Sequence, residues 1–307
     1  MVISKQQSNA FWEIKAFAIF TVFFAHMPVL SDNIPHIAYF FEVAGVVGVP
    51  MFMMMSGFFN LHSTTPLGKT FLRLFVPLLI WGSVCFTLHI IKTPTDTIVV
   101  DWIKFVMGSK SVFYFVPMLF CCILLVHYVN DWFLLLLGVL SQVLSSLQTL
   151  FPYGDVWTVN LNPFNFTVYF CLGRLIRKYW GGRVSYKFLM PICLICSIVF
   201  PLFITPSYEN PFIVAVAFSV MILTYGLFIN YKNKWLIEIG KMSFVIYLCH
   251  IQIAGFIQAL YRPLWGTWLE LTKVFVAFFI VCVFCFALKS VLVQFKLEKV
   301  TRYLGFR

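Results

Sequence analysis

The feature of this sequence that most constrains its fold is a succession of long apolar runs. Roughly ten of them, most close to 20 residues long, follow one another along nearly the whole chain. An α-helix of about 20 apolar residues crosses a hydrocarbon core about 30 Å thick. The sequence therefore predicts an all-α, polytopic integral membrane protein, with spans at 11–30, 37–59, 71–91, 112–130, 132–151, 163–180, 187–205, 211–230, 243–260 and 273–294.

The composition agrees with this class. Of the 307 residues, 61% are hydrophobic and only 11% are charged, whereas a soluble domain carries about 25% charged residues. No stretch has the composition of a separate soluble domain, so we expect one transmembrane module over residues 1–307. The polar start at 1–9, followed by a run long enough to span, argues against a cleavable signal peptide.

The loop cations predict the orientation. With the N-terminus inside, most Lys and Arg residues fall in the inner loops, near 69–73, 174–187, 232–241 and 289–307. Because positive loops stay on the cytoplasmic side, both termini are expected to be cytoplasmic. The net charge of +11 is then explained by orientation and by contact with anionic membrane lipid. No basic face outside the membrane is available for nucleic acid.

The nine cysteines all fall within predicted spans, where cysteine behaves as a small hydrophobic residue. The spacing of Cys193 and Cys196 is that of a redox or metal motif, but no further ligands accompany it. We therefore expect neither a disulfide framework nor a metal site. Outside the spans, residues 98–107 alternate apolar and charged positions, as an interfacial helix does. Such a helix either closes over a site or lies passively on the outer face.

Lys15 and His26 are the first candidate site residues, since both lie in the first predicted span. Cations and imidazoles are costly in hydrocarbon and are rare there without a function. Eleven helical positions correspond to a rise of about 16 Å. That separation suits a long, anionic thioester donor lying along the helix, with Lys15 at its charged end.

Glu42 and His250 are further candidates inside predicted spans. Glu42 falls at a depth similar to that of His26 on the next helix, and a carboxylate beside an imidazole fixes its tautomer and raises its basicity. Alternatively, Glu42 pairs with a lysine or is protonated in a wet crevice. His250 is a functional candidate by its location; the alternative is a histidine bonded to a neighbouring carbonyl.

Candidate donor contacts gather at the predicted cytoplasmic ends. Ser56 and Gly57 offer a small polar notch, which serves either a ligand or close helix packing. Lys69, Arg73 and Arg174 lie at inner helix ends, where they form either a phosphate cradle or simple orientation anchors.

Five segments, in order along the chain, resemble elements of the acyltransferase 3 family. In the first helix, Lys15 and His26 have the spacing of the family's Arg/Lys-x10-His element. The other matching segments are 49–58 with Ser56 and Gly57, 69–77 with Lys69 and Arg73, the aromatic segment 113–120, and 241–250 with Tyr247 and His250. In size and layout the chain is most similar to short, single-module members such as the O-acetyltransferases of enterobacterial common antigen.

The resemblance implies a ten-helix enzyme of the cell inner membrane that uses cytosolic acyl-coenzyme A, with acetyl-CoA as the expected donor. The acceptor would be a hydroxyl of a cell-envelope polysaccharide or a lipid-linked sugar, and glycan-assembly enzymes would be possible partners. Lys15 would bind donor phosphates, and His26 would be the general base or hold the thioester. Tyr247 and His250 are further candidates. The chain departs from the family at Trp12, where relatives carry an acidic residue, and at Lys15, where Arg is common.

Three alternatives stay open at this point. The acetyl group passes either directly to the acceptor or through an acyl-His26 intermediate. In the second alternative, the chain exports a surface polysaccharide or its lipid-linked precursor, and His26 and Glu42 form a proton relay. A sensing or scaffold protein would tolerate loss of His26.

Overall fold

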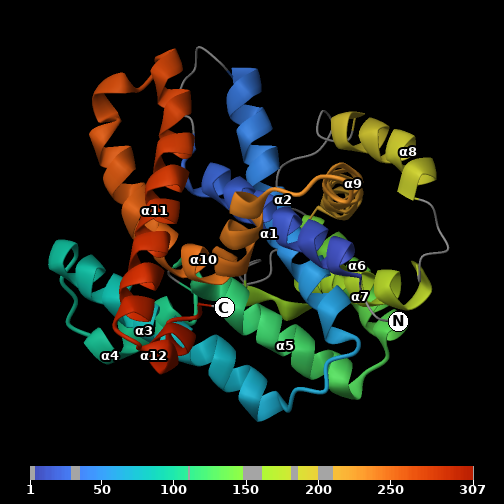
Figure 1. The fold of residues 1–307 in the computed structure, drawn as a ribbon, viewed down its shortest axis with the longest axis horizontal. Coiled ribbons are helices and arrows are strands. Elements are labelled where there is room, and N and C mark those ends of the chain that lie inside the picture. Colours follow the sequence, from blue (N-terminus) through green and yellow to red (C-terminus); the bar gives the residue numbers. More distant parts are fainter. Residues whose placement is uncertain are drawn as a thin grey trace. The chain divides into compact units, whose positions relative to one another are not determined.

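The computed structural model describes residues 4–28, 35–109, 111–147, 161–180, 186–199 and 210–306. Within these ranges the chain is helical and contains no strand (Figure 1). The elements in order are α1 (Lys5–His26), α2 (Pro35–Asn60), α3 (Leu67–Lys92), α4 (Ile98–Val106), η1 (Val112–Tyr114), α5 (Phe115–Tyr128), α6 (Asp131–Ser146), α7 (Pro163–Trp180), α8 (Tyr186–Val199), α9 (Phe212–Phe228), α10 (Lys234–Leu260), η4 (Arg262–Leu264), η5 (Trp268–Leu271), α11 (Thr272–Gln294) and α12 (Glu298–Tyr303).

The all-α class is confirmed for the described ranges, and a helix is present at every predicted span. By length and composition, four described helical segments can cross a membrane: Ile37–Asn60, Leu67–Lys92, Lys234–Leu260 and Trp268–Gln294. Shorter apolar helices occupy Val112–Tyr128, Asp131–Ser146, Leu189–Val199 and Phe212–Phe228. Crossing by all ten spans and the orientation of the termini stay predictions. The ends of three predicted spans, at 29–30, 148–151 and 200–205, lie outside the described residues.

The start of α10 differs clearly from the hydropathy pattern. α10 begins at Lys234 instead of 243, because Asn233 caps its first turn by accepting hydrogen bonds from the backbone N–H groups of Trp235 (2.9 Å) and Leu236 (3.3 Å). The predicted interfacial helix is present as α4, and the short α12 follows the last predicted span.

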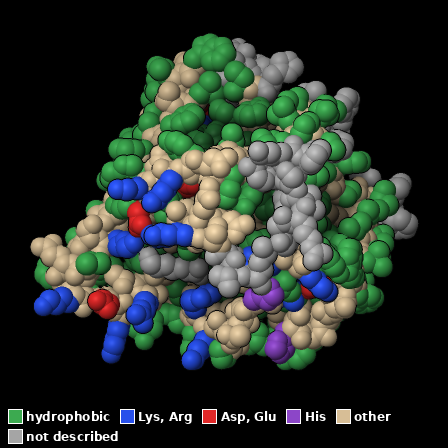
Figure 2. All heavy atoms as spheres, turned by 45° about the vertical axis from the view of Figure 1, so that its right-hand side comes forward, with side chains coloured by type: hydrophobic (Ala, Val, Ile, Leu, Met, Phe, Trp, Pro, Cys, Tyr) green, Lys and Arg blue, Asp and Glu red, His purple; other side chains and the backbone are tan. Residues whose placement is uncertain are grey.

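Large apolar side chains cover much of the molecular surface. Figure 2 shows hydrophobic side chains over much of the visible face. Soluble monomers rarely expose apolar patches of such extent, and lipid tails provide the medium that accommodates them. Exposed examples lie on α3 (Leu72, Leu79, Ile91), α8 (Ile192, Ile195, Ile198) and α11 (Phe275, Phe279, Val283).

The chain folds as two compact units. The first comprises Met1–Val22, Val46–Thr64 and Met118–Gly240, and the second comprises Phe23–Gly45, Thr65–Pro117 and Lys241–Arg307. The chain passes from one unit to the other within α1, α2 and α10. Lys15 therefore belongs to the first unit, whereas His26 and His250 belong to the second.

Glycines let helices of the first unit approach closely. A Cβ atom built on Gly57 of α2 would lie 1.9 Å from the carbonyl oxygen of Phe170 in α7. In the reciprocal direction, a Cβ on Gly173 of α7 would lie 1.8 Å from the carbonyl oxygen of Met54. Backbone therefore meets backbone where α2 crosses α7, which only glycine permits. In the same unit, α6 packs on α7 and α8 packs on α9 (Figure 1).

In the second unit, indole N–H groups and a phenol join helices to loops. Trp102 of α4 donates to the Ser83 hydroxyl of α3 (3.1 Å), and Trp81 of α3 donates to the carbonyl of Leu304 after α12 (3.2 Å). The Tyr247 hydroxyl of α10 donates to the Val112 carbonyl in η1. These bonds join α3 to α4 and to the C-terminal segment, and α10 to η1.

Candidate functional site

Two imidazoles lie side by side in the second unit. His26 is the last residue of α1, His250 lies in the middle of α10, and their ring centroids are 5.1 Å apart. His250 is fully buried, whereas His26 is half-buried. Phe23, one turn before His26, also contacts the His250 ring, at 5.3 Å between centroids. One ring of the pair is therefore closed off from solvent, and the other is partly exposed.

The hydrogen bond of His250 determines where its proton lies. Nδ1 is 2.5 Å from the carbonyl oxygen of Tyr247. Since a carbonyl only accepts, Nδ1 carries the proton and Nε2 carries the lone pair. Nε2 is buried and has no hydrogen-bond partner among the described residues. His250 is therefore a histidine bonded to a neighbouring carbonyl, as one of the two alternatives expected. This bond uses only Nδ1, and Nε2 remains as a basic nitrogen without a hydrogen bond in the described residues.

Tyr247 supports this arrangement from the same helix. Its carbonyl holds His250, and its ring meets Phe115 nearly edge-on at 5.3 Å. Its hydroxyl is bonded to Val112, as described above. Tyr247 is therefore placed to hold His250 in position.

Glu42 is not joined to His26 within the described ranges. No hydrogen bond or ion pair links the two residues there, and the Glu42 side chain is exposed on α2. A catalytic role for Glu42 stays a prediction.

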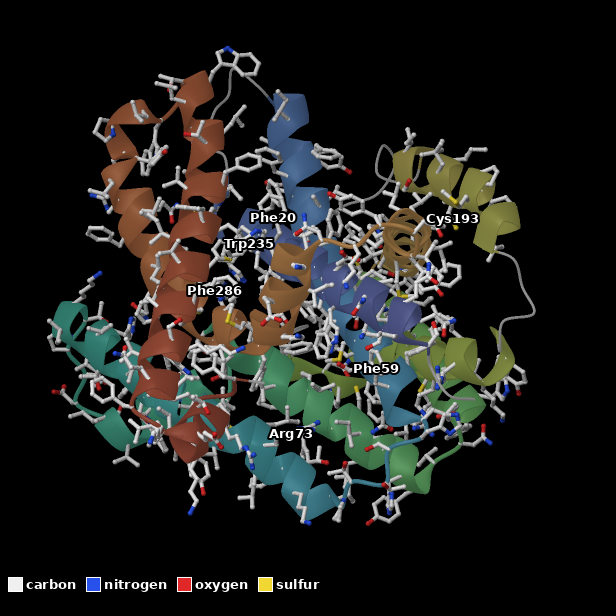
Figure 3. All side chains as sticks on the ribbon, viewed as in Figure 1. Phe20, Phe59, Arg73, Cys193, Trp235 and Phe286 are labelled. Carbon is white, nitrogen blue, oxygen red and sulfur yellow. The ribbon has the colours of Figure 1, made fainter. Side chains whose placement is uncertain are left out.

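Lys15 lies in the first unit against aromatic rings. Its Nζ is 4.6 Å from the ring centroid of Trp12 and 5.3 Å from the ring centroid of Phe59. Phe59 lies at the end of α2 and is labelled in Figure 3. Such rings attract an ammonium through their negative faces. An aromatic face therefore accompanies the cation at this position. The carboxylate of Glu13 instead accepts the Asn233 backbone N–H at the start of α10 (2.5 Å).

The other predicted donor contacts lie at helix ends of both units. Ser56 is half-buried, and the adjacent Gly57 serves the close packing of α2 with α7. The packing role of the predicted notch is therefore confirmed, and its ligand role stays a prediction. Lys69 and Arg73 are exposed on α3, where their spacing of four places them on one face (Figure 3 labels Arg73).

Arg174 is engaged by protein groups. Its Nε donates to Asp131 at the start of α6 (2.7 Å), and its Nη1 donates to the Asn60 side chain at the end of α2 (2.6 Å). The guanidinium therefore ties three helices together. A donor phosphate would have to replace one of these partners.

Sequence comparison decides the family. A family model described as an acyltransferase domain, acyltransferase 3, matches residues 11–288. The chain belongs to the acyltransferase 3 family. Comparison with curated proteins and with solved structures gave no significant match. Membership in the family, together with the apolar helices, makes the protein a membrane acyltransferase in general class.

Sequence reasoning missed two parts of the second unit. Phe23 is indistinguishable by sequence from the many other phenylalanines of the spans, so nothing marked its contact with His250. A buried ion pair, Lys273 with Glu270, was also missed. Opposite charges three residues apart at the edge of an apolar run were the available signal. Within the described residues, no group of three or more metal-ligating side chains is found.

Proposed function

We propose that this membrane acyltransferase is an O-acetyltransferase that moves an acetyl group from cytosolic acetyl-CoA to a hydroxyl of a cell-envelope polysaccharide or lipid-linked sugar. The observation that carries the proposal is the pair of His26 and His250, in which a reachable imidazole lies beside a buried one. Acyl transfer to a hydroxyl needs a group that accepts the hydroxyl proton while the oxygen attacks.

In the proposed reaction His26 is the general base. It takes the proton of the acceptor hydroxyl as the oxygen attacks the thioester carbonyl carbon. The carbon–sulfur bond then breaks, and the sulfur leaves as the thiol of coenzyme A with the proton returned from His26. The acceptor keeps the acetyl group as an ester, so atoms and charge balance. Holding hydroxyl and thioester together supplies much of the rate.

His250 assists through the nitrogen that the Tyr247 carbonyl leaves unengaged. With Nδ1 protonated, Nε2 offers a second lone pair beside His26. In this role it orients the His26 ring or the acceptor hydroxyl without itself carrying charge. The route through acetyl-His26 uses the same residues and predicts an acetylated α1 peptide after rapid quenching.

Lys15 is the proposed contact for the donor phosphates. It shares α1 with His26, and eleven positions on that helix correspond to a rise of about 16 Å, comparable to the reach from the diphosphate to the thioester of coenzyme A. Ser56, Lys69, Arg73 and Arg174 are the further proposed donor contacts, and Glu42 a proposed partner in catalysis. Residence in the inner membrane and cooperation with glycan-assembly enzymes belong to the same proposal.

The decisive experiment follows radiolabelled acetyl from acetyl-CoA to envelope glycan or lipid-linked sugar, using purified protein in lipid nanodiscs. Wild type is expected to label the acceptor. His26→Ala is expected to lower kcat by about a hundredfold or more, the usual contribution of a general base. His127→Ala is the matched control, because His127 is an exposed histidine of α5 outside the pair.

Two outcomes would contradict the proposal. Full transfer by His26→Ala would remove His26 from the chemistry. Absence of transfer by wild type, together with sugar-lipid flux across the nanodisc membrane that His26→Ala abolishes, would instead identify an exporter.

A further inference from the structure

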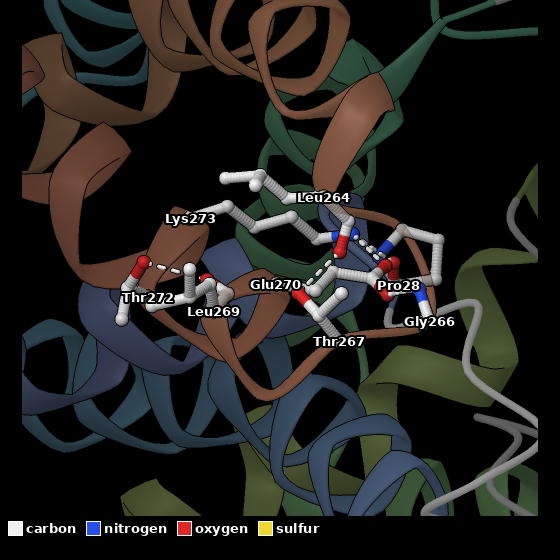
Figure 4. A network of polar contacts seen from close by, with 8 residues as sticks. All are labelled: Pro28, Leu264, Gly266, Thr267, Leu269, Glu270, Thr272 and Lys273. Atoms are coloured by element: carbon white, nitrogen blue, oxygen red, sulfur yellow. Dashed lines mark hydrogen bonds and ion pairs between the residues drawn. The ribbon is translucent and has the colours of Figure 1, made fainter.

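A fully buried ion pair lies at the end of α1 in the second unit. Lys273, in the first turn of α11, and Glu270, in η5, are both 0% exposed. The Lys273 ammonium donates to Glu270 Oε1 (2.7 Å) and to the carbonyl oxygen of Pro28 (2.5 Å), and Glu270 Oε2 accepts the Gly266 backbone N–H (3.1 Å) (Figure 4). Pro28 is two residues beyond His26.

The pair is poorly explained by fold stability alone. Lys273 stands in the first turn of α11, where the helix dipole disfavours a cation. Both charges are also removed from water, a cost that a buried ion pair seldom recovers, so apolar replacements are often equally stable. The Lys273 ammonium does bind the Pro28 carbonyl, just after the C-terminal end of α1. A cation is favoured at that end of a helix.

α11 contacts the same part of α1 at two further points. Phe278 meets Phe23 edge-on at 5.2 Å, and Phe275 meets Phe24 edge-on at 6.4 Å between ring centroids. Phe23 in turn packs on His250. The last turn of α1 is thus fixed by side chains of α11 on both sides of the position where His26 leaves the helix.

We propose that Lys273, held in place by Glu270, is a positioning residue that keeps His26 beside His250. It acts through the backbone, because its ammonium binds the Pro28 carbonyl. The inference rests on the proposed function for its link to catalysis. Its geometric part, that the ion pair fixes the end of α1, is tested independently of activity.

The test compares variants in nanodiscs. Lys273→Met alone leaves the Glu270 carboxylate buried without its cation and is expected to fold poorly. The informative variant is Lys273→Met with Glu270→Gln, which removes both charges while a side-chain oxygen still accepts from Gly266. Lys273→Arg is the conservative variant, since it keeps the charge and donors for Pro28.

Two readouts separate positioning from a general structural role. In acetyl transfer, the double variant is expected to lower kcat about ten- to a hundredfold, as a small misplacement of a catalytic group does, while KM for acetyl-CoA changes by less than about twofold. In diethyl pyrocarbonate labelling followed by peptide mass spectrometry, His26 is expected to react about threefold faster because its helix end opens more often. Labelling of His127 is expected to be unchanged, and Lys273→Arg to behave as wild type in labelling.

A folded double variant with wild-type kcat and wild-type labelling of His26 would overturn the inference. Altered labelling in a protein whose wild type transfers no acetyl would overturn the proposed function and leave the positioning intact. If the double variant fails to fold, Lys273→Leu with Glu270→Gln is used, because it also leaves no buried charge and removes the bond to Pro28. Wild-type labelling of His26 in that variant overturns the inference.

Discussion

Neighbouring backbone groups and aromatic rings contact the candidate site side chains. His250 is bonded to the Tyr247 carbonyl and packed on Phe23, and Lys15 lies against Trp12 and Phe59. Such contacts restrict the orientation of a side chain. Replacement of a ring by one of similar shape therefore separates chemistry from packing.

His250→Phe is the sharpest such replacement. The phenyl ring retains the contact with Phe23 but has no nitrogen, so the fold is expected to persist and kcat for acetyl transfer to fall by about a hundredfold. The loss of one hydrogen bond to the Tyr247 carbonyl is expected to cost only about 1 kcal/mol. Steady-state kinetics and thermal unfolding in detergent check both effects. A kcat within twofold of wild type would remove His250 from the mechanism.

Sequence alone could identify Lys15, His26 and His250 because polar groups stand out in apolar spans. It could not show that His26 meets His250, since those residues lie near opposite ends of the chain and no spacing relates them. Arg174 was expected to contact a donor, but its engagement by Asp131 depends on a tertiary contact between α7 and α6. The burial of Lys273 likewise depends on tertiary packing, which the sequence does not show.

The helices themselves are largely determined by local sequence, whereas their pairing is determined by small residues. Hydropathy was sufficient to locate α1–α3 and α5–α11, because an apolar stretch in lipid must satisfy its own backbone hydrogen bonds, whereas α4 was located by its alternating pattern. Which helices meet depends on where backbones approach, and apolar side chains alone give little preference in lipid. The crossing of α2 and α7 is decided by Gly57 and Gly173, one of which the sequence had already indicated as a notch.

Gly57→Ala tests this crossing. The added methyl group would overlap the Phe170 carbonyl, so α2 and α7 must separate, at an expected cost of about 1–3 kcal/mol. Gly255→Ala is the matched control in α10, because no heavy atom lies within 4 Å of its Cβ position. That control is expected to be neutral or slightly stabilising, as alanine is the better helix former. The midpoints of thermal unfolding of the two variants are compared in one detergent. Equal midpoints would contradict the prediction that Gly57→Ala is the less stable variant.

At the scale of the whole molecule, the distribution of charge and apolar surface predicts how the chain lies in the membrane. The C-terminal segment after α11 carries Lys296, Lys299 and Arg302, and the broad apolar faces of α3, α8 and α11 suit lipid contact. The positive residues should keep this segment on the cytoplasmic side.

Reporter fusions at the C-terminus check that orientation. A fluorescent protein fused after residue 307 is expected to fluoresce, and alkaline phosphatase at the same place is expected to be inactive, because the phosphatase matures only outside the cytoplasm. Fusions after residue 109, in the predicted outer connection, should show the reverse. An active phosphatase at the C-terminus would contradict the predicted even number of crossings.

The unengaged nitrogen of His250 has a consequence for bioenergetics. A base surrounded by rings and a carbonyl, with no carboxylate bonded to it in the described part of the chain, is a poor long-term store for a proton. In the proposed mechanism His250 therefore stays neutral, and the proton that His26 takes from the acceptor hydroxyl passes to the departing sulfur. Turnover would then be proton-neutral, and esterification would proceed without drawing on the proton-motive force of the cell.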